Sequence, residues 1–247
     1  MTESWIGGIN PVESALRNDP AHVRELVVES GRRNARVQEL VERAQQLQIP
    51  LQHASREELD RHAGDARHQG IAVRCEMPPA AQEGDLAALL ERDGRAALVL
   101  VLDGVTDPHN LGACLRSAAA AQVTAVVVPK DRAVGLTPVV RRAAAGGADR
   151  VPLVAVTNLA RTLRDLKDAG IWLTGLAGGS DKSIYSVDLN GPVALVLGGE
   201  GGGLRRLTRE LCDFEAGIPM PGAMESLNVS VATGIVLFEA LRQRGVK

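Results

Sequence analysis

The apolar positions of the chain form short runs that alternate with stretches of helical spacing. Beyond residue 92 the apolar runs are built mainly from Ala, Val and Leu. Runs that are apolar at every position are typical of parallel strands that helices cover on both faces. We therefore expect strands at residues 96–102, 125–128, 171–173, 193–197 and 214–218, and helices at 111–120, 137–144, 159–168, 204–211 and 227–244.

The first 76 residues follow a different pattern, in which helical and extended stretches alternate over short lengths. A single apolar stripe at 37, 40, 41, 44 and 47 predicts a helix over residues 36–47. The remaining pattern predicts helices at 11–18 and from residue 56, and strands at 25–28, near 51 and at 71–75. The result is a small α/β sandwich near the lower size limit for a domain that folds alone.

The periodicity breaks between these two parts. Residues 76–84 read EMPPAAQEG, and two prolines in so short a stretch stiffen the backbone and stop regular structure. We therefore predict an N-terminal domain at 1–76, a linker at 77–91 and a larger domain at 92–247. Ser226 is placed to cap the last helix of the larger domain.

The composition narrows the function classes. Aromatic residues make up only 2%, which disfavours modules that stack bases on aromatic platforms. The net charge of −2 disfavours a general nucleic-acid coat. RNA binding would then depend on local clusters such as Arg32, Arg33 and Arg36, although this cluster taken alone favours a solvated loop. The three cysteines are widely spaced, and we find no export leader and no membrane-length apolar run. We expect a cytoplasmic protein without a metal site.

The first candidate site is the turn after the strand at 96–102. Residues 103–116 read DGVTDPHNLGACLR, with Asn110 near a helix start and Arg116 six residues later. Asn110 suits a helix cap and Arg116 suits an exposed surface position. The alternative interpretation of the two residues is a clamp for a phosphate or a sugar, because a guanidinium offers a planar fork of donors. Ligands of open α/β sheets collect beyond the carboxyl ends of strands, where this turn is expected.

The second candidate site is the turn after the strand at 193–197. Residues 197–204 read LGGEGGGL, and so many glycines indicate a tight backbone turn or a close approach to a ligand. The spacing fits neither the dinucleotide-binding fingerprint nor a P-loop. Glu200 would accept a hydrogen bond from a ligand or hold a cationic partner such as Arg116.

The third candidate site is the loop before the last helix, where residues 218–230 read IPMPGAMESLNVS. Two prolines and a glycine predict a structured loop, and Ser226, Asn228 and Ser230 open the helix. They suit helix caps, and a helix N-terminus behind a rigid apolar loop also suits an adenosine or an anion. The three turns hold no Ser-His-Asp order, carboxylate pair or metal spacing. They indicate positioning and group transfer rather than hydrolysis.

Together and in this order, the three blocks resemble the signature motifs of the SpoU (TrmH) family of RNA ribose 2′-O-methyltransferases in the SPOUT superfamily. Residues 68–70, 102–117 and 226–239 are similar to the bacterial members that methylate a guanosine ribose in 23S rRNA, and the resemblance covers essentially the whole chain. It implies an RNA-binding domain like ribosomal protein L30e at 1–76. It also implies a parallel-sheet SPOUT catalytic domain with a C-terminal trefoil knot at 92–247.

The resemblance further implies roles for individual residues. The cofactor would be S-adenosylmethionine, held largely by backbone groups around Thr174, Leu197, Gly198, Gly201, Ile218, Met220 and Leu227. The catalytic set would be Asn110, Arg116, Glu200, Ser226 and Asn228. Glycine at 198 and 201 would keep a Cβ from colliding with the cofactor. A guanidinium stays protonated at neutral pH, so we expect Arg116 to hold the adjacent phosphate and stabilise the developing alkoxide.

Some positions depart from the family pattern and leave the exact nucleotide open. Met224 and Glu225 stand where smaller residues are common, and Asp149 stands where Glu is frequent. The leading hypothesis is methylation of a guanosine in the peptidyl-transferase region of 23S rRNA by a homodimer, with no metal or membrane partner. The alternatives are a tRNA ribose methyltransferase and a non-catalytic RNA-binding or ribosome-assembly module. The glycine spacing disfavours a nicotinamide-dependent oxidoreductase.

Overall fold

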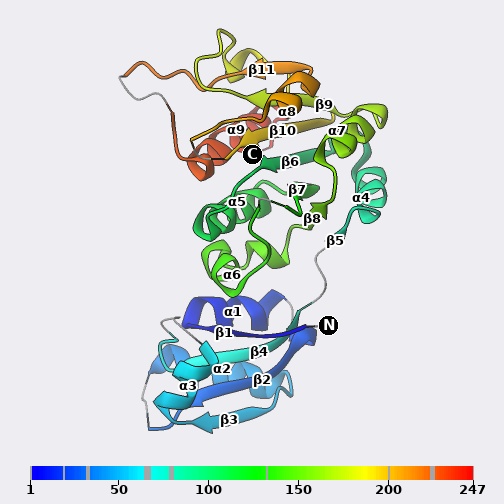
Figure 1. The fold of residues 1–247 in the computed structure, drawn as a ribbon. Helices are drawn as coiled ribbons and strands as arrows, with labels where there is room; N and C mark the ends of the chain where they lie inside the picture. The colour runs from blue at the N-terminus through cyan, green and yellow to red at the C-terminus, as the bar shows by residue number, and fades with distance from the viewer. Residues whose placement is uncertain are drawn as a thin grey trace. The chain divides into compact units, whose positions relative to one another are not determined.

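The computed structural model describes residues 2–18, 20–31, 34–63, 68–77, 81–131, 133–199, 201–222 and 226–246. The chain divides into two units, Met1–Pro79 and Ala80–Lys247 (Figure 1). Each unit buries its own apolar cluster, so each is built as a domain in its own right.

The N-terminal unit is a four-stranded mixed sheet with helices on both faces. Its strands are β1 (Thr2–Gly7), β2 (Val23–Glu29), β3 (Leu51–Ala54) and β4 (Ile71–Met77), in the order β1-β4-β2-β3. Strands β2 and β3 run parallel, while β4 is antiparallel to β1 and β2. Helices α1 (Ile9–Asn18) and α2 (Ala35–Gln46) pack on one face, and α3 (Arg56–Ala63) covers the other through Leu59. The predicted α/β sandwich is confirmed.

The block His68-Gln69-Gly70 forms the turn into β4. Gln69 and Gly70 both have positive φ, 55° and 81°. The His68 Nδ1 atom accepts a hydrogen bond from the Gly70 N–H at 3.0 Å, so its Nε2 carries the proton and donates to Asp60 Oδ1 at 3.0 Å. The Gln69 Oε1 atom accepts from the Ile9 N–H at 3.1 Å. This block is therefore a structural turn tied to α1 and α3.

The arginine cluster of this unit is only partly described. Arg32 and Arg33 lie outside the described residues. The Arg36 guanidinium donates to Asn10 Oδ1 at 3.0 Å and to Glu13 Oε2 at 3.2 Å. Arg36 thus ties α2 to α1 across an exposed surface.

The C-terminal unit is built on a seven-stranded parallel sheet in the order β11-β9-β10-β6-β7-β8-β5. The central strands are buried at every position, as their apolar runs predict. The parallel sheet of the predicted fold class is confirmed. The strands are β5 (Ala81–Gln82), β6 (Leu98–Asp103), β7 (Ala125–Pro129), β8 (Leu153–Val156), β9 (Trp172–Leu176), β10 (Val193–Gly198) and β11 (Phe214–Ala216).

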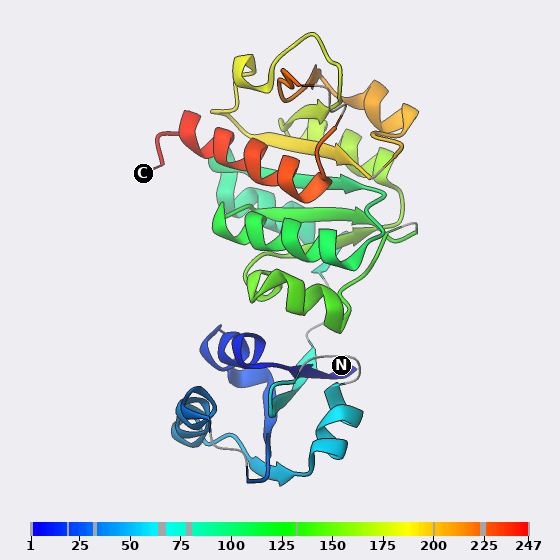
Figure 2. The ribbon, with the colours of Figure 1, turned by 90° about the vertical axis from the view of Figure 1, so that its left-hand side faces the viewer.

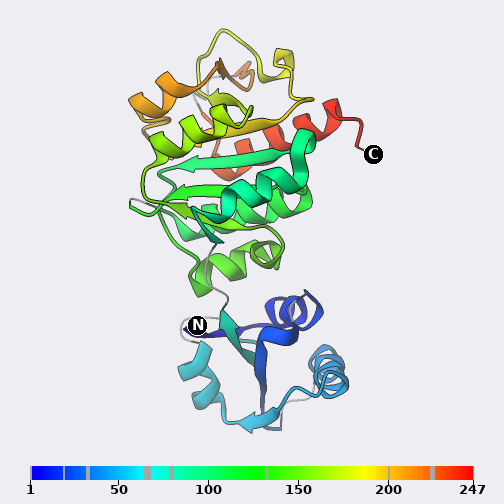
Figure 3. The ribbon, with the colours of Figure 1, turned by 90° about the vertical axis from the view of Figure 1, so that its right-hand side faces the viewer.

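Helices cover both faces of this sheet. One face carries α5 (Pro108–Ala120), α6 (Pro138–Ala144) and α9 (Val229–Gln243) (Figure 2). The other carries α4 (Asp85–Asp93), α7 (Leu159–Asp168) and α8 (Arg206–Leu211) (Figure 3). Side chains of one strand alternate between the two cores: Leu100 of β6 joins the first, and Val99 and Val101 join the second. No helix in the described part of the chain is long and apolar enough to cross a membrane.

The C-terminal end of α9 is held by Arg244. Its guanidinium donates to four backbone carbonyls, those of Leu189 (3.0 Å), Ala96 (2.6 Å), Ala97 (3.2 Å) and Gly191 (2.7 Å). Burial lowers the pKa of this guanidinium, which nevertheless stays protonated at neutral pH. These carbonyls precede β6 and β10, so the last helix is fixed to the amino edge of the sheet while its other end faces the carboxyl edge.

The segment predicted as a linker, 77–91, is instead partly folded. Strand β5 pairs with β8, and α4 begins at Asp85 and buries Leu86. Leu86, Leu89 and Leu90 of α4 do pack on the core at helical spacing, but the prolines before them directed the prediction toward a linker. A two-residue strand has no periodicity of its own. The second unit therefore starts near Ala80 rather than at residue 92. Pro78 and Pro79, which suggested the linker, lie outside the described residues.

Candidate active site

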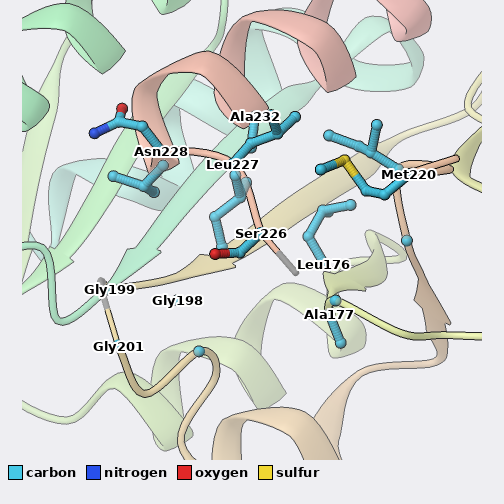
Figure 4. A pocket seen from close by; sticks show the side chains of 16 residues that line it. Leu176, Ala177, Gly198, Gly199, Gly201, Met220, Ser226, Leu227, Asn228 and Ala232 are labelled. Carbon is cyan, nitrogen blue, oxygen red and sulfur yellow. The ribbon is translucent and has the colours of Figure 1, made fainter. Parts of the chain in front are cut away.

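A cavity of about 470 Å³ opens at the carboxyl edge of the parallel sheet, within the volume range typical of small-molecule sites. Its walls come from the loops after β9, β10 and β11 and from the start of α9 (Figure 4). Parallel strands bring these loops together because all of their carboxyl ends meet at one edge. The cavity is lined by six of the residues predicted to hold a cofactor: Leu197, Gly198, Gly201, Ile218, Met220 and Leu227.

Thr174, the seventh predicted cofactor residue, lies elsewhere. It is fully buried in the middle of β9, and the residue that lines the cavity is Leu176, two positions along the same face. Strand β9 extends to Leu176, beyond its predicted end at 173, so the rim of the sheet is shifted by one side-chain layer.

The cavity wall is largely apolar. In Figure 4 the side chains of Leu176 and Leu227 lie between the glycine loop on one side and Met220 on the other. Ala232, one turn into α9, adds to this wall. Leu176 lies in the stretch around Thr174 that the resemblance implied, whereas Ala232 was not predicted, because it does not stand out in sequence from the core residues around it. A flat apolar ring would fit between such side chains, with its polar edge toward the backbone of the loops.

Asn110 is not the cap of α5. Asp107 is the cap, and its carboxylate accepts hydrogen bonds from the His109 and Asn110 N–H groups at 3.2 Å each, with Pro108 at the first helical position. The side chain of Asn110 is therefore not used as the cap. Its Oδ1 atom accepts a hydrogen bond of 3.0 Å from the Asn228 side-chain amide.

The last helix is capped by Asn228, not by Ser226 as the sequence suggested. The Asn228 Oδ1 atom accepts from the Ser230 N–H at 2.9 Å and from the Ser230 hydroxyl at 2.6 Å. Helix α9 therefore starts at Val229, two residues later than predicted. Ser226 is exposed and lines the cavity instead, as does Asn228.

Arg116 is exposed on α5 and does not line the cavity. Six residues of helix separate it from Asn110, a rise of roughly 9 Å along the axis. Its backbone is closely packed, because a Cβ on Gly147 would lie 2.8 Å from the Arg116 Cα. Within the described part of the chain its guanidinium has no carboxylate partner. The helix thus presents this cation about 9 Å along its axis from Asn110.

The glycines of the second motif are required by the chain itself. A Cβ on Gly198 would lie 2.0 Å from the carbonyl carbon of Gly203, and one on Gly199 would lie 2.3 Å from the Gly104 oxygen. Gly201 has a φ of +77° and nothing within 4 Å of its Cβ position. The backbone contact at Gly198 and the positive φ at Gly201 thus favour glycine without reference to a cofactor, and our expectation that a Cβ there would meet the cofactor stays a prediction.

Some predicted positions cannot be placed. Glu200, Met224 and Glu225 lie outside the described residues. Asp149, the other departure from the family pattern, pairs with Arg141 of α6, and both side chains are largely buried. Asp149 therefore belongs to the packing of α6 and not to the cavity.

The described groups around the cavity contain no reactive thiol. Burial raises the pKa of the Cys114 thiol to about 11, and its Sγ atom lies 3.3 Å from the Thr233 hydroxyl. Burial raises the pKa of Cys212 to about 12. Among the described residues no group of three His, Cys, Asp or Glu side chains could hold a metal ion. Among the described residues, the lining of the cavity offers amides, hydroxyls and backbone groups to a ligand, and the guanidinium of Arg116 lies outside the lining.

Two family comparisons agree with these features. Residues 97–238 match the SpoU rRNA Methylase family. Residues 5–81 match the family described as RNA 2′-O ribose methyltransferase substrate binding. The two matches fall on the two units of the fold.

Individual relatives match over nearly the whole chain. The 23S rRNA (guanosine-2′-O-)-methyltransferase RlmB of Xanthomonas campestris pv. campestris is 57% identical over 240 residues, which covers 97% of this chain and 96% of that protein. The SpoU methyltransferase AviRb from Streptomyces viridochromogenes has a TM-score of 0.79 at 25% identity, covering 98% of this chain and 90% of AviRb. AviRb in complex with AdoMet has a TM-score of 0.77 at 24% identity, covering 99% and 92%.

Proposed function

The chain belongs to the SpoU rRNA methylase family, and from this premise we propose that it methylates the ribose 2′-hydroxyl of a guanosine in 23S rRNA. The methyl donor in this proposal is S-adenosylmethionine (AdoMet). The observation that carries the proposal is the cavity at the carboxyl edge of the sheet, whose rim holds Asn228 bonded to Asn110. One end of the cavity can hold a cofactor while the asparagine pair meets a second substrate.

The cavity fits AdoMet in size and in chemistry. Its volume of about 470 Å³ lies in the range of cofactor sites, and its apolar wall suits an adenine ring. Leu176, Ile218 and Leu227 would pack against the ring, and the backbone of the loops after β9, β10 and β11 would meet its polar edge. AdoMet supplies a methyl group activated on a sulfonium sulfur.

Asn110, Asn228 and Arg116 would then orient the ribose. The two asparagines hold each other in one conformation, so their amide groups are positioned before the RNA arrives. Arg116 would hold the phosphate beside the target nucleotide and stabilise negative charge on the 2′-oxygen. None of the described residues that line the cavity carries a carboxylate or an imidazole. In this proposal the proton of the 2′-hydroxyl leaves to that phosphate or to water.

The substrate follows from the N-terminal unit together with the curated relatives. Residues 5–81 match a substrate-binding family of RNA ribose methyltransferases, and the relative with 57% identity is named as a 23S rRNA guanosine methyltransferase. We propose that the N-terminal unit grips 23S rRNA and that the target lies in the peptidyl-transferase region. The setting would be the cytoplasm.

The working form in this proposal is a homodimer. Val231 and Phe238 of α9 are 50% and 53% exposed, which is unusual for large apolar side chains on one helix. A second copy would cover this surface. Light scattering of the purified chain tests the dimer, and Phe238→Glu should shift it to the monomer.

The reaction is tested by transfer of labelled methyl from AdoMet to 23S rRNA purified from cells that lack this protein. We expect one labelled guanosine, mapped as a 2′-O-methyl site, and loss of the label with Arg116→Ala. Label on tRNA instead of rRNA would keep the chemistry and overturn the substrate. If wild-type protein binds rRNA but labels neither RNA, the chain is a binding module and the proposal fails.

A further inference from the structure

Asp103, at the end of β6, lies at the junction of the two loops that build the site. Its side chain is completely buried, and it faces Gly198 in the register of β6 and β10. Gly104 follows it and begins the loop to α5, where Asn110 stands. A buried carboxylate is costly unless charge and hydrogen bonds compensate it. The groups that pair with the Asp103 carboxylate therefore show which part of the chain it fixes.

The partner of Asp103 is Arg205, 102 residues further along the chain. Asp103 Oδ1 accepts from Arg205 Nε at 2.5 Å and also pairs with Arg205 Nη2. The second carboxylate oxygen, Oδ2, accepts from the Arg205 backbone N–H at 3.2 Å. Both the charge and the backbone of Arg205 are thus fixed by one carboxylate.

The same aspartate also holds the other end of the glycine loop. The Asp103 backbone carbonyl accepts a hydrogen bond of 3.0 Å from the Gly199 N–H. Gly199 and Gly203 form an isolated antiparallel bridge inside the loop. Asp103 therefore holds Gly199, at the start of the glycine loop, through one hydrogen bond and Arg205, at its end, through an ion pair.

The glycines between these two fixed points are part of the cavity wall. Gly199, Gly201 and Gly203 all line the cavity, and Figure 4 shows Gly198, Gly199 and Gly201 leaving the end of β10 along one side of it. Glycine has no side chain to hold the loop in one shape, so its conformation depends on fixed points at its ends. Asp103 and Arg205 are those fixed points.

We propose that Asp103 and Arg205 are a positioning pair that keeps the glycine loop in the conformation that binds AdoMet. This inference rests on the proposed function, because it concerns the same cavity. The pair touches no substrate. It acts through the backbone of residues 199–205, and its loss is expected to weaken cofactor affinity while leaving the rate at saturating cofactor close to that of the wild type.

The two members of the pair differ in a way that the test can use. Asp103 is 0% exposed and Arg205 is 45% exposed at the side chain. Removing Arg205 leaves a buried charge without compensation, whereas removing the charge of Asp103 leaves a cation that water can solvate. Arg205→Gln should therefore be more damaging than Asp103→Asn. The double variant Asp103→Asn/Arg205→Gln should be more stable than Arg205→Gln alone.

The experiment measures AdoMet affinity of the full-length chain by calorimetry, steady-state methyl transfer and amide exchange of residues 199–205. Asp103→Asn should raise the AdoMet Kd and KM by about 10-fold or more, keep kcat within about 2-fold, and speed exchange in the loop but not in β7. The AdoMet Kd of Arg205→Lys should lie between those of the wild type and Arg205→Gln. The control is Arg206→Gln, which removes an exposed ion pair with Glu210. It should leave the AdoMet Kd, kcat and amide exchange of the loop unchanged.

The outcomes separate this inference from the proposed function. If wild-type chain does not bind AdoMet, the proposed function fails. If wild-type chain binds AdoMet and Asp103→Asn binds equally well, the positioning pair is wrong. A loss of kcat without a change of Kd would also contradict it. If Arg205→Gln does not fold, the double variant replaces it, and failure of the double variant to recover folding overturns the buried-charge argument.

Discussion

The Asn228 side-chain amide donates a hydrogen bond of 3.0 Å to Asn110, which is 118 residues earlier in the chain. The same Asn228 uses its Oδ1 atom to cap α9 through Ser230. One residue therefore performs two tasks with the two ends of its amide. The cap stabilises the helix, and the bond to Asn110 joins the starts of α5 and α9 at the rim of the cavity.

Substitution of Asn228 should separate these tasks. Asn228→Asp keeps the oxygen that caps α9 but replaces the donor with a second oxygen facing Asn110. We expect methyl transfer to fall about 100-fold with little change in thermal stability. Asn228→Ala should lose both activity and roughly 1 kcal/mol of stability, because it also removes the cap. Thermal unfolding and rates measured on the same preparations check this. Full activity in Asn228→Asp would contradict the role of the donor.

Removal of Arg116 should act on the reaction and not on cofactor binding. The side chain is exposed and lies outside the cavity, so Arg116→Ala is expected to leave the AdoMet Kd within about 2-fold while kcat falls about 100-fold or more. The matched control is Arg164→Ala, an exposed arginine of α7 on the opposite face of the sheet. Calorimetry measures the AdoMet Kd, and single-turnover kinetics measure the rate of methyl transfer. Equal losses in affinity and rate would refute the assignment.

Alanine substitutions at the glycines of the loop should cost very different amounts of folding free energy. Gly198→Ala places a Cβ 2.0 Å from the backbone of Gly203, and we expect a loss of about 3 kcal/mol or a failure to fold. Gly201→Ala has free space but a positive φ, and should cost about 1 kcal/mol. Gly202→Ala meets nothing within 4 Å and has no positive φ, so it should stay within about 0.5 kcal/mol of wild type. Chemical denaturation of the three variants tests the order.

The buried Cys114 predicts how stability depends on pH. Burial raises its pKa to about 11, whereas an exposed thiol in the unfolded chain ionises near 8.5. Below pH 8 the Cys114 thiol is protonated in both the folded and the unfolded chain, so its contribution to stability is fully present. Above pH 9 the unfolded chain gains free energy by ionising, so stability falls as the pH rises toward 11.

The measurement compares urea unfolding at pH 8 and pH 10.5 for wild type and for Cys114→Ala. The variant should lose less stability between the two pH values, by roughly 1 to 3 kcal/mol. Iodoacetamide should leave Cys114 unmodified in the folded chain at pH 8, because the thiol is both buried and protonated. Identical pH dependence in the two proteins would contradict the raised pKa.

The sequence was sufficient for elements with a strong local signal. Helix α7 was predicted at its observed bounds, because Leu159, Leu163 and Leu166 form a clear stripe and Asn158 caps it. The parallel strands β6, β7 and β10 were predicted because runs such as Val99 to Leu102 are apolar on both faces. Six of the seven predicted cofactor residues line the cavity, and these positions came from the resemblance to the family motifs rather than from local spacing.

The features that were not predicted from the sequence depend on residues that lie far apart in the chain. Strand β1 mixes polar residues with Trp5 and Ile6, and it exists because it pairs with β4 about 70 residues later. The strand β5 consists of two residues and depends on β8. The ion pair of Asp103 and Arg205 spans 102 residues, and no local pattern distinguishes its members from other charges near a turn. The cap of α9 was misplaced because both Ser226 and Asn228 are good caps, and only the three-dimensional path selects Asn228.

The contacts of Gly198 and Gly199 bear on how this motif is interpreted in other proteins. Both glycines are required because backbone meets backbone, at Gly203 and at Gly104, before any ligand is present. Selection for folding alone would then preserve them in descendants that had lost methyl transfer. A glycine-rich block of this kind marks common ancestry, whereas Arg116, an exposed side chain that packing does not require, is a position where a duplicated gene that had become inactive would first diverge.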